Sequence, residues 1–509
     1  MWHTFSYDST HSRILISAKA WSDFGWMFPL ARSFSFGNNW PPQNPLFAGE
    51  PLKYHFLLYL TVGMLEKVGV QIDWAFNLIS GFGFFILLFM IFFVARKLFN
   101  SNKVAILSLA FFLFNGSLSF LEYFQEHGWR WETIKNIIHN SQYPSFGPWD
   151  GSQIAAIWNL NIYTNQRPFG FSLGLVLLLI YFLYVKQRIN AVTVGSIIAT
   201  LLFLNQGLLP ALAILISWHF LVFPHLRKDV IKMLFFTIPF VLYSFRFVNP
   251  FSAEFHPGFL INTPLTFTNV AKYWFANLGL HTFLIPIGIL MAPPLAKQLA
   301  VPLLAIFLLP NLVQFSPDMF NNHKLLNVFI VLGGMYSAWT IFRLWKIRPL
   351  KIVIPILIFL VTFSGIIDLF ALANDSIIPV PDIKSNPDAR FFYQNTPPNS
   401  TVLNSTWFYH PASLAGRLLF NGYPYFTWAH GYDQVTREQL TQSIYSAPTA
   451  KIACRLLRAH DISYVELNRR PESFLRPNWY LWQQVFVPEY SNPDSGINVY
   501  NVFHICPGT

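Results

Sequence analysis

The sequence predicts a polytopic α-helical membrane protein of about ten transmembrane helices, followed by a C-terminal extracytoplasmic α/β domain. Of its 509 residues, 53% are hydrophobic and only 11% are charged, whereas an ordinary soluble chain has about a quarter charged residues. Apolar windows that are long enough, or nearly so, to cross a hydrocarbon core of about 30 Å recur along the chain. These windows are 75–95, 104–121, 168–185, 190–206, 208–224, 231–247, 276–293, 298–313, 326–343 and 352–373.

Lys and Arg gather in every second connection between these windows. With Asp229 as the single acid, that set holds the cations Arg96, Lys97, Lys103, Lys186, Arg188, Arg227, Lys228, Lys232, Lys297, Arg343, Lys346, Arg348 and Lys351. The positive-inside rule places these connections in the cytoplasm. The remaining connections, 122–167, 248–275 and 314–325, then lie outside, as do residues 1–74 and the chain after about 374. Because this asymmetry explains most of the net charge of +11, we expect no nucleic-acid partner.

The chain divides into three predicted regions. Residues 1–74 form an extracytoplasmic first loop with short interfacial helices, residues 75–373 the transmembrane helical domain, and residues 380–509 the extracytoplasmic α/β domain. The opening "MWHTFSYDSTHSRILISAKAW" has neither the apolar core of a signal peptide nor a spanning helix that could carry it across. We therefore expect a first helix to be missing from this chain, which would make eleven spans. Unaided translocation of a short tail is the alternative.

The C-terminal region has the periodicity of a small α/β domain. Four segments are predicted as strands, "TVL" (401–403), "SYVEL" (463–467), "WQQVFV" (482–487) and "INVYNVF" (497–503). Two have helical spacing, "PDARFFYQ" (387–394) and "TAKIACRLLRAH" (449–460). Cys454 and Cys506 both belong to this domain. They can form a disulfide in an oxidising compartment, and two buried thiols are an equally good interpretation.

Residues 22–56 are too polar and too rich in proline to cross a membrane, yet they precede a chain that is mostly membrane. This stretch contains acids and bases among many aromatic rings: Asp23, Arg32, Asn38, Asn39, Glu50, Lys53 and His55. Their order is an acid, the apolar run "GWMFPLARSFSFG", the polar turn "NNWPP", then "AGE" and the basic-aromatic end "EPLKYHF". Such a stretch predicts an external site.

This order resembles the first external loop of the membrane-embedded C-type (GT-C) glycosyltransferases, above all the branch of the protein O-mannosyltransferases and the lipid A aminoarabinose transferases. "EPLKYHF" stands where that branch has a "KPPL-aromatic" run. The later segment "FSPDMFNNHKLLNVFIVLGGMYSA" is similar to the family's later external loop, where a basic residue reaches a lipid phosphate. Lys324, with His323 beside it, occupies that place. A multi-span body followed by an external domain with "AGRLLFNG" and "TWAHGYD" also resembles the layout of this superfamily.

The resemblance implies an enzyme that moves a sugar from a polyprenyl-phosphate carrier to a lipid, glycan or protein acceptor outside the cytoplasm, in the cell membrane. Such transfer needs a carboxylate to take the acceptor proton and cations to hold the leaving phosphate. Asp23 is the predicted general base. The predicted phosphate-binding residues are Lys53, His55, Lys324 and His323, and the secondary candidates are Arg32, Glu50, Arg167 and Asp318. Asp23, Lys53, His55 and Lys324 would surround one cavity open to the outer leaflet. We expect no metal site and no cofactor besides the lipid-linked sugar, which is the substrate.

Plain structural roles compete with these assignments. Asp23 can instead cap a short helix, and the lysines can be interfacial anchors, the interpretation that we favour for Arg167. A local ion-pair network of Arg32, Glu50 and His55 can simply hold the loop in shape. His219 and Asp368, inside spans, should face other helices because lipid exposure is costly.

Two other classes of function also remain. A transporter or flippase would line its path with these acids and bases, although such carriers usually place acids near the bilayer centre. A non-catalytic scaffold would use the external domain to bind a partner.

Overall fold

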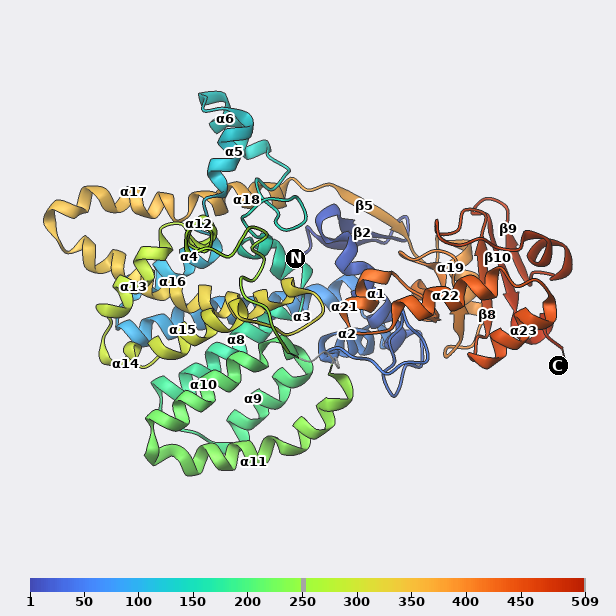
Figure 1. Cartoon of the computed structure of the whole chain (residues 1–509), viewed down its shortest axis with the longest axis horizontal. Helices are drawn as coiled ribbons and strands as arrows, with labels where there is room; N and C mark the ends of the chain where they lie inside the picture. Colours follow the sequence, from blue (N-terminus) through green and yellow to red (C-terminus); the bar gives the residue numbers. More distant parts are fainter. Residues whose placement is uncertain (249–252, 508–509) are drawn as a thin grey trace. The chain divides into compact units, whose positions relative to one another are not determined.

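The computed structural model describes residues 1–248 and 253–507 of the chain (Figure 1). Its contacts divide the chain into two compact units. The first is built mainly from Met1–Ile79 and Ile377–Thr509, and the second mainly from Ser80–Phe245 and Phe251–Ser376. The predicted first loop and the predicted C-terminal domain therefore share one unit, and most of the predicted transmembrane region forms the other.

A three-stranded antiparallel sheet joins the two ends of the chain in the first unit. The hairpin of β1 (Phe5–Asp8) and β2 (Arg13–Ser17) pairs through β2 with β5 (Ile377–Pro381). Ile16 lies opposite both Phe5 and Ile378. The sequence analysis assigned no strand to this region, because β1 and β2 are short and their third partner is more than 300 residues away along the chain.

One helix of the first unit contains the start of the predicted site stretch, and a second follows its end. α1 (Trp21–Ser35) packs against α2 (Leu57–Lys67). The close approach depends on Gly63, where an added Cβ would lie 2.5 Å from the carbonyl oxygen of Ala31. The apolar run between the acid and the polar turn is thus a helix, as the pattern indicated.

The C-terminal part of the first unit contains a mixed five-stranded sheet in the order β7-β6-β8-β10-β9. Its strands are β7 (Leu418–Leu419), β6 (Thr401–Leu403), β8 (Tyr464–Asn468), β10 (Ile497–Asn501) and β9 (Tyr490–Asn492). β6 is parallel to both of its neighbours, β7 and β8, and β10 is antiparallel to β8 and β9. Three of the four predicted strands are confirmed.

The strand predicted over 482–487 is wrong. Leu481–Val485 forms a π-helical turn instead. The Asn478 side chain accepts a hydrogen bond from the Leu481 amide, and the fully buried Trp482 donates its indole N–H to the carbonyl of Tyr445. These contacts favour helical backbone where the local pattern favoured a strand.

Helices complete the C-terminal part, and the two predicted ones are confirmed. They are α19 (Pro387–Asn395), α20 (Pro411–Leu414), α21 (Pro424–Ala429), α22 (Gln434–Tyr445), α23 (Ala450–Ala459) and α24 (Val502–Ile505). A disulfide between Cys454 on α23 and Cys506 ties the end of the chain to this core, with their Cα atoms 5.5 Å apart. The disulfide alternative is therefore the correct one.

The second unit is helical, and the described residues contain five helices long and apolar enough to cross a membrane. They are Ile72–Phe99 (α3, which starts in the first unit), Pro224–Phe247 (with α11, Arg227–Ser244), Pro294–Asn311 (with α14, Pro294–Lys297, and α15, Ala300–Leu308), Met319–Trp345 (with α16, His323–Trp345) and Arg348–Ala373 (with α17, Val353–Leu360, and α18, Phe363–Ala373). α16 is the most enclosed of them and packs against α4, α13 and α15. The remaining apolar helices are shorter: α4 (Asn102–Leu113), α8 (Phe169–Ile180), α9 (Ala191–Leu204) and α10 (Leu209–Val222). The number of ten spans stays a prediction.

Two predicted windows are interrupted. α12 (Phe267–Leu278) and α13 (His281–Leu290) bend by 88° within window 276–293, at a break where Gly279 has a φ of 52°. Window 104–121 is not one helix, because α4 ends at Leu113 and α5 (Ser119–His127) starts after a turn. In that turn the Asn115 side chain accepts hydrogen bonds from the amide and hydroxyl of Ser117.

Short elements connect the long helices of the second unit. They are α6 (Trp131–Asn136), α7 (Asn161–Asn165) and the two-stranded sheet of β3 (Glu254–Phe255) and β4 (Val313–Gln314). His219 and Asp368 are both buried, and the Asp368 carboxylate accepts a hydrogen bond of 2.6 Å from the amide of Asn115. The prediction that they face protein is confirmed.

Candidate functional site

Asp23 lies in the first turn of α1 and is half-buried. It is not the helix cap, because the N-cap residue is Ala20 and no side chain caps this end. The capping interpretation is therefore wrong. The 3₁₀ turn Ala18–Ala20 continues directly into α1. The first turn of α1 therefore follows residues that are already helical.

The charge of the Asp23 carboxylate acts on two tyrosines. Burial raises the pKa of Tyr54, and the negative charge of Asp23 raises it further. The pKa of Tyr409 is raised by the same two causes in the same order. The Tyr409 hydroxyl donates a hydrogen bond of 2.6 Å to the carbonyl of Trp21, in the same helical turn as Asp23. Both phenols therefore stay protonated, and the Trp21 carbonyl accepts the hydrogen bond of Tyr409.

Aromatic rings continue from these tyrosines. The Trp26 ring lies 5.7 Å from that of Tyr54 and 4.6 Å from that of His430, both edge-on. Trp21 lies 4.2 Å from Tyr409. Aromatic faces beside hydrogen-bonding groups suit the alternating C–H and O–H surfaces of a sugar. His430 belongs to "TWAHGYD", which the sequence analysis associated with the external domain but not with the site.

His55 and Lys53 belong to the same unit but differ in surroundings. The His55 ring is buried and stacks on Tyr54 with 3.8 Å between centroids. The Lys53 ammonium lies 4.4 Å from the ring centroid of Tyr432 and donates a hydrogen bond of 3.4 Å to the carbonyl of Gly431. His55 thus stacks on the tyrosine whose pKa the Asp23 charge raises, whereas Lys53 contacts the residues after His430.

Arg32 forms buried ion pairs, but with partners other than those that the sequence suggested. Its guanidinium is 2% exposed and pairs with Glu66 at 2.8 Å and with Asp382 at 3.0 Å. Burial opposes this charge, but the two carboxylates keep the pKa of Arg32 raised. The predicted network of Arg32, Glu50 and His55 is therefore wrong. The charge of Glu50 acts instead on Arg437, whose pKa burial lowers to about 10 against the opposing effect of Glu50.

His323 and Lys324 begin α16 in the second unit, and both are buried. A hydrogen-bonded chain surrounds His323: its Nε2 lies 3.0 Å from Gln166 Nε2, its Nδ1 lies 3.3 Å from Asn327 Nδ2, and Asn327 accepts from the Tyr163 hydroxyl. The Lys324 ammonium donates to Asn321 at 3.0 Å.

Gly207 gives the lysine stem its room, since a Cβ there would lie 2.3 Å from Lys324 Cδ. Lys324 is 6% exposed, so it is no lipid-facing anchor.

The secondary candidates of the second unit also lie near this helix start. Arg167 is 1% exposed, which overturns the interpretation as a lipid anchor. It follows Gln166, which contacts His323. Asp318 caps the short 3₁₀ turn Met319–Asn322 by accepting from the amide of Phe320 at 3.0 Å. The structure thus gathers His323, Lys324 and their polar neighbours in one unit, and Asp23, Lys53 and His55 in the other. The cavity common to both sets stays a prediction.

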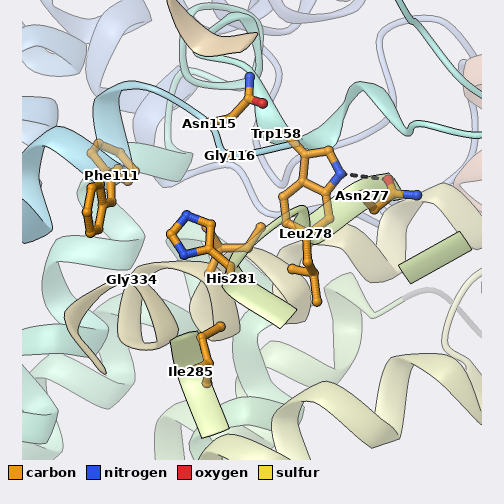
Figure 2. A pocket seen from close by; sticks show the side chains of 11 residues that line it. Phe111, Asn115, Gly116, Trp158, Asn277, Leu278, His281, Ile285 and Gly334 are labelled. Carbon is orange, nitrogen blue, oxygen red and sulfur yellow. Dashed lines mark hydrogen bonds between the residues drawn. The ribbon is translucent and has the colours of Figure 1, made fainter. Parts of the chain in front are cut away.

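A small cavity of about 30 Å³ lies elsewhere in the second unit (Figure 2). His281 and Trp158 line it; the imidazole contacts the Ser337 hydroxyl at 2.8 Å, and the indole donates to Asn277 at 2.7 Å. A cavity of this size holds water rather than a sugar, whose binding sites are about tenfold larger. None of the predicted site residues lines it.

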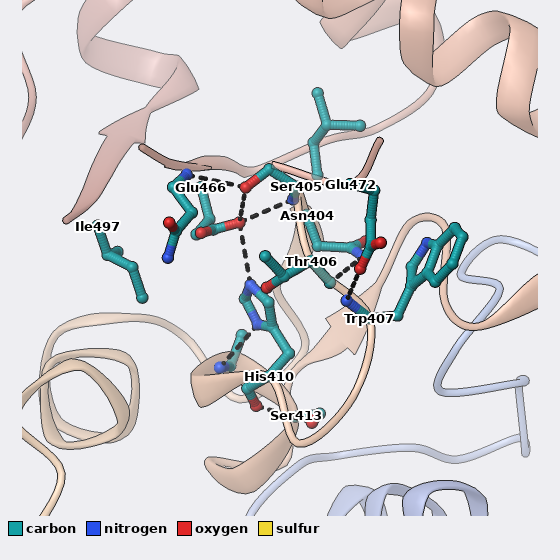
Figure 3. A network of polar contacts seen from close by, with 12 residues as sticks. Asn404, Ser405, Thr406, Trp407, His410, Ser413, Glu466, Glu472 and Ile497 are labelled. Carbon is teal, nitrogen blue, oxygen red and sulfur yellow. Dashed lines mark hydrogen bonds and ion pairs between the residues drawn. The ribbon is translucent and has the colours of Figure 1, made fainter. Parts of the chain in front are cut away.

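A buried Ser, His and Glu lie together in the first unit (Figure 3). Glu466 Oε2 pairs with His410 Nε2 at 3.1 Å and accepts from the Ser405 hydroxyl at 3.0 Å. The Ala412 amide donates to His410 Nδ1, which places the imidazole proton on Nε2. Because the serine donates to the carboxylate and all three side chains are inaccessible, this network joins β6, β8 and α20 rather than forming a nucleophilic site.

Comparisons with known proteins come from a family model and from solved structures. Residues 23–156 match the family described as "Uncharacterized membrane protein (DUF2298)". Comparison with curated proteins found no significant match. With the five long apolar helices, the family match identifies an integral membrane protein.

Among solved structures, the chain is similar to the Archaeoglobus fulgidus oligosaccharyltransferase in its apo form, with 13% identity, a TM-score of 0.41 and coverage of 89% of this chain and 66% of that one. It is also similar to the oligosaccharyltransferase AglB of that organism in complex with an inhibitory peptide and a dolichol-phosphate, with 12% identity, a TM-score of 0.37 and coverage of 88% and 65%. The chain therefore spans just under two thirds of the length of these solved chains.

No group of three or more His, Cys, Asp or Glu side chains in the described part of the chain is arranged to hold a metal ion.

Proposed function

We propose that the protein is a GT-C glycosyltransferase that moves a sugar from a polyprenyl-phosphate carrier to an acceptor outside the cytoplasm, with Asp23 as the general base. The observation that carries the proposal is the half-buried Asp23 carboxylate on a helical turn whose Trp21 and Trp26 pack against Tyr409 and Tyr54, two phenols whose pKa its charge raises. A carboxylate in such a place can accept a proton from a sugar or side-chain hydroxyl, while the aromatic rings hold the apolar face of the substrate.

The reaction then has a simple balance. The Asp23 carboxylate takes the proton of the acceptor hydroxyl as its oxygen forms a bond to the anomeric carbon of the sugar. The bond from that carbon to the phosphate oxygen breaks, and the lipid phosphate leaves with the electron pair. A cation that holds this phosphate stabilises the charge that develops in the transition state.

Lys324, with His323 beside it, is the proposed partner of the leaving phosphate. An ammonium that is 6% exposed at the start of a membrane helix is costly to maintain, and such groups usually serve a substrate or an ion. The Asn321 side chain accepts a hydrogen bond from this ammonium at the start of the helix, in the segment that carries the resemblance. The resemblance of that segment to the family's later external loop supports this assignment.

The test is sugar transfer from a polyprenyl-phosphate donor by the purified protein in nanodiscs. Asp23→Asn keeps the shape of the side chain but removes the proton acceptor, so turnover should fall by roughly 10²- to 10⁴-fold with little change in donor binding. Asp433→Asn is the matched control, because Asp433 is an exposed helix cap of the same unit and Asn caps equally well. Near-normal turnover in Asp23→Asn would remove this residue from the mechanism.

Lys324→Met separates the role of the cation from that of the base. It keeps most of the stem that packs beside Gly207 and removes the charge, so both donor binding and turnover should fall. Lys346→Met, at the exposed opposite end of the same helix, should change neither. Movement of the lipid-linked sugar across proteoliposomes without any transfer would instead favour a flippase.

A further inference from the structure

One segment of the second unit has an apolar face that its own helices do not cover. It consists of α5, α6 and the 3₁₀ turn Ile137–His139, and we call it the α5–α6 arm. Figure 1 shows the arm projecting from the helices of this unit, beside α18. Tyr123, Phe124 and Ile137 of the arm form a buried cluster with Ile367 of α18.

The arm is fixed at the point where a membrane helix ends. Arg348–Ala373 is one of the five candidate spans, and Asn374 is the next residue. The Asn374 side-chain amide donates to the carbonyls of Ile138 at 2.9 Å and Asn140 at 3.0 Å. The arm therefore lies at the level of the membrane–water boundary, whichever side of the membrane that is.

The outer face of the arm is an apolar stripe. Trp131, Ile134 and Ile138 are 63%, 44% and 53% exposed, and their spacing of three and four residues puts them on one face of the helical segment. Thr133 and Ile137 are buried on the side that meets the unit. The stripe is thus distinct from the face that holds the arm in place.

Polar groups border the stripe. Glu132, Lys135 and Asn136 are exposed, and the Lys135 ammonium lies 5.9 Å from the ring centroid of Trp131. Trp129, which is 67% exposed, stacks on Phe124 at 4.7 Å. Tryptophan and a snorkelling lysine beside an apolar face are typical of a helix that lies in the plane of a bilayer surface.

We propose that the α5–α6 arm is an interfacial anchor that inserts Trp131, Ile134 and Ile138 into the bilayer at the end of α18. The ligand is the lipid itself, at the boundary between headgroups and acyl chains. Continuity with a membrane-spanning helix selects this occupant, because the carbonyls of the arm bind the first residue after that span. Without contact to lipid, the same three side chains would form an apolar patch exposed to water next to the membrane.

The experiment places one environment-sensitive fluorophore at a time on the full chain. The sequence has two cysteines and both are in the disulfide, so Ile134→Cys is the single free thiol of its variant. Asn136→Cys, two residues away and outside the stripe, is the matched control. Each labelled protein is reconstituted in nanodiscs with phosphatidylcholine that carries a doxyl quencher either near the headgroup or near the chain end.

The label at 134 should emit at shorter wavelength than the label at 136 and be quenched several-fold more strongly by the shallow doxyl group. Equal, water-like emission and weak quenching at both positions would place the arm in solvent and overturn the proposal. A shielded label at 134 that no lipid quenches would do the same, because a protein surface would then cover the stripe. Ile138→Cys repeats the measurement at a second stripe position, which guards against a local effect of one label.

Discussion

Arg32 lies at the centre of a buried ion cluster, and its replacement should destabilise the first unit. Its guanidinium joins three segments: its own helix α1, α2 through Glu66, and the chain after β5 through Asp382. Bidentate bonds of 3.1 and 3.0 Å reach Asp382, and the rings of Phe28 and Phe36 each lie 4.6 Å from the guanidinium. Arg32→Met fills much of the same volume but leaves two carboxylates, each 7% exposed at the side chain, without their cation.

The expected magnitude follows from burial. Breaking a buried pair by removing one partner costs about 3–5 kcal/mol. For a domain of about 150–250 residues, each kcal/mol shifts Tm by roughly 2–4 °C, so Arg32→Met should lower Tm by about 6–20 °C at pH 7. Arg390→Met, an exposed arginine of the same unit, should change the free energy of unfolding by less than about 0.5 kcal/mol.

The pH dependence of stability tests whether the loss of the Arg32 charge causes the destabilisation. In the native cluster burial favours a neutral Asp382, but the Arg32 charge prevails and lowers its pKa below the ordinary 3.8. The stability from this group is present above 3.8 and is lost as pH falls through its folded pKa. Without Arg32, only hydrogen bonds from Ile383 and Tyr7 oppose the effect of burial, so the folded pKa of Asp382 rises. The deficit of Arg32→Met relative to the native protein should therefore shrink as pH falls from 7 toward 4.

Thermal unfolding in detergent, followed by tryptophan fluorescence, measures both effects. The triple variant Arg32→Met, Glu66→Gln, Asp382→Asn should recover part of the loss, because no buried charge remains. A Tm within about 2 °C of the native value for Arg32→Met, or a deficit that grows on acidification, would refute the reasoning.

Three further outcomes are expected. Asn38 and Asn399 are exposed residues of one unit, so thiol probes at Asn38→Cys and Asn399→Cys should both react with an impermeant reagent from outside intact cells; labelling from the cytoplasmic side alone would contradict the topology. Cys454→Ser should lower the free energy of unfolding by about 4 kcal/mol, given the 52-residue separation of the disulfide, and unchanged unfolding curves with and without reductant in the native protein would contradict this. Gly365→Ala should disrupt the contact of α18 with the turn after α4, because its Cβ would lie 2.2 Å from the backbone nitrogen of Asn115; expression and Tm equal to those of Gly81→Ala, where a Cβ meets open space, would show that the backbone shifts to make room.

The membrane class and the positions of the apolar segments could be predicted from the sequence because long apolar runs are local and have few alternative environments. Two of the C-terminal helices, α19 and α23, and three of the four predicted strands were predictable for the same reason, since amphipathic periodicity reflects one buried face. The π-helical turn that contains Trp482 escaped prediction because its indole hydrogen bond to Tyr445 is a long-range contact.

The candidate site was predictable only in part. Asp23, His55 and Tyr54 come from one polar stretch that stood out against an apolar chain. Their neighbours Tyr409 and His430 come from a segment more than 350 residues later, and no local pattern distinguished those two rings from the many others.

Composition and periodicity thus established that this is a membrane protein with a C-terminal α/β part, because both depend on the nearest residues and the solvent. The pairing of Arg32 with Asp382, the pairing of β2 with β5 and the hydrogen bond of Asn115 with Asp368 were settled by folding. Each of them joins segments more than 250 residues apart, and in such cases a side chain's role depends on which groups packing brings to it. For Arg32 those groups are two buried carboxylates, and their charge makes it a structural cation instead of a ligand for phosphate.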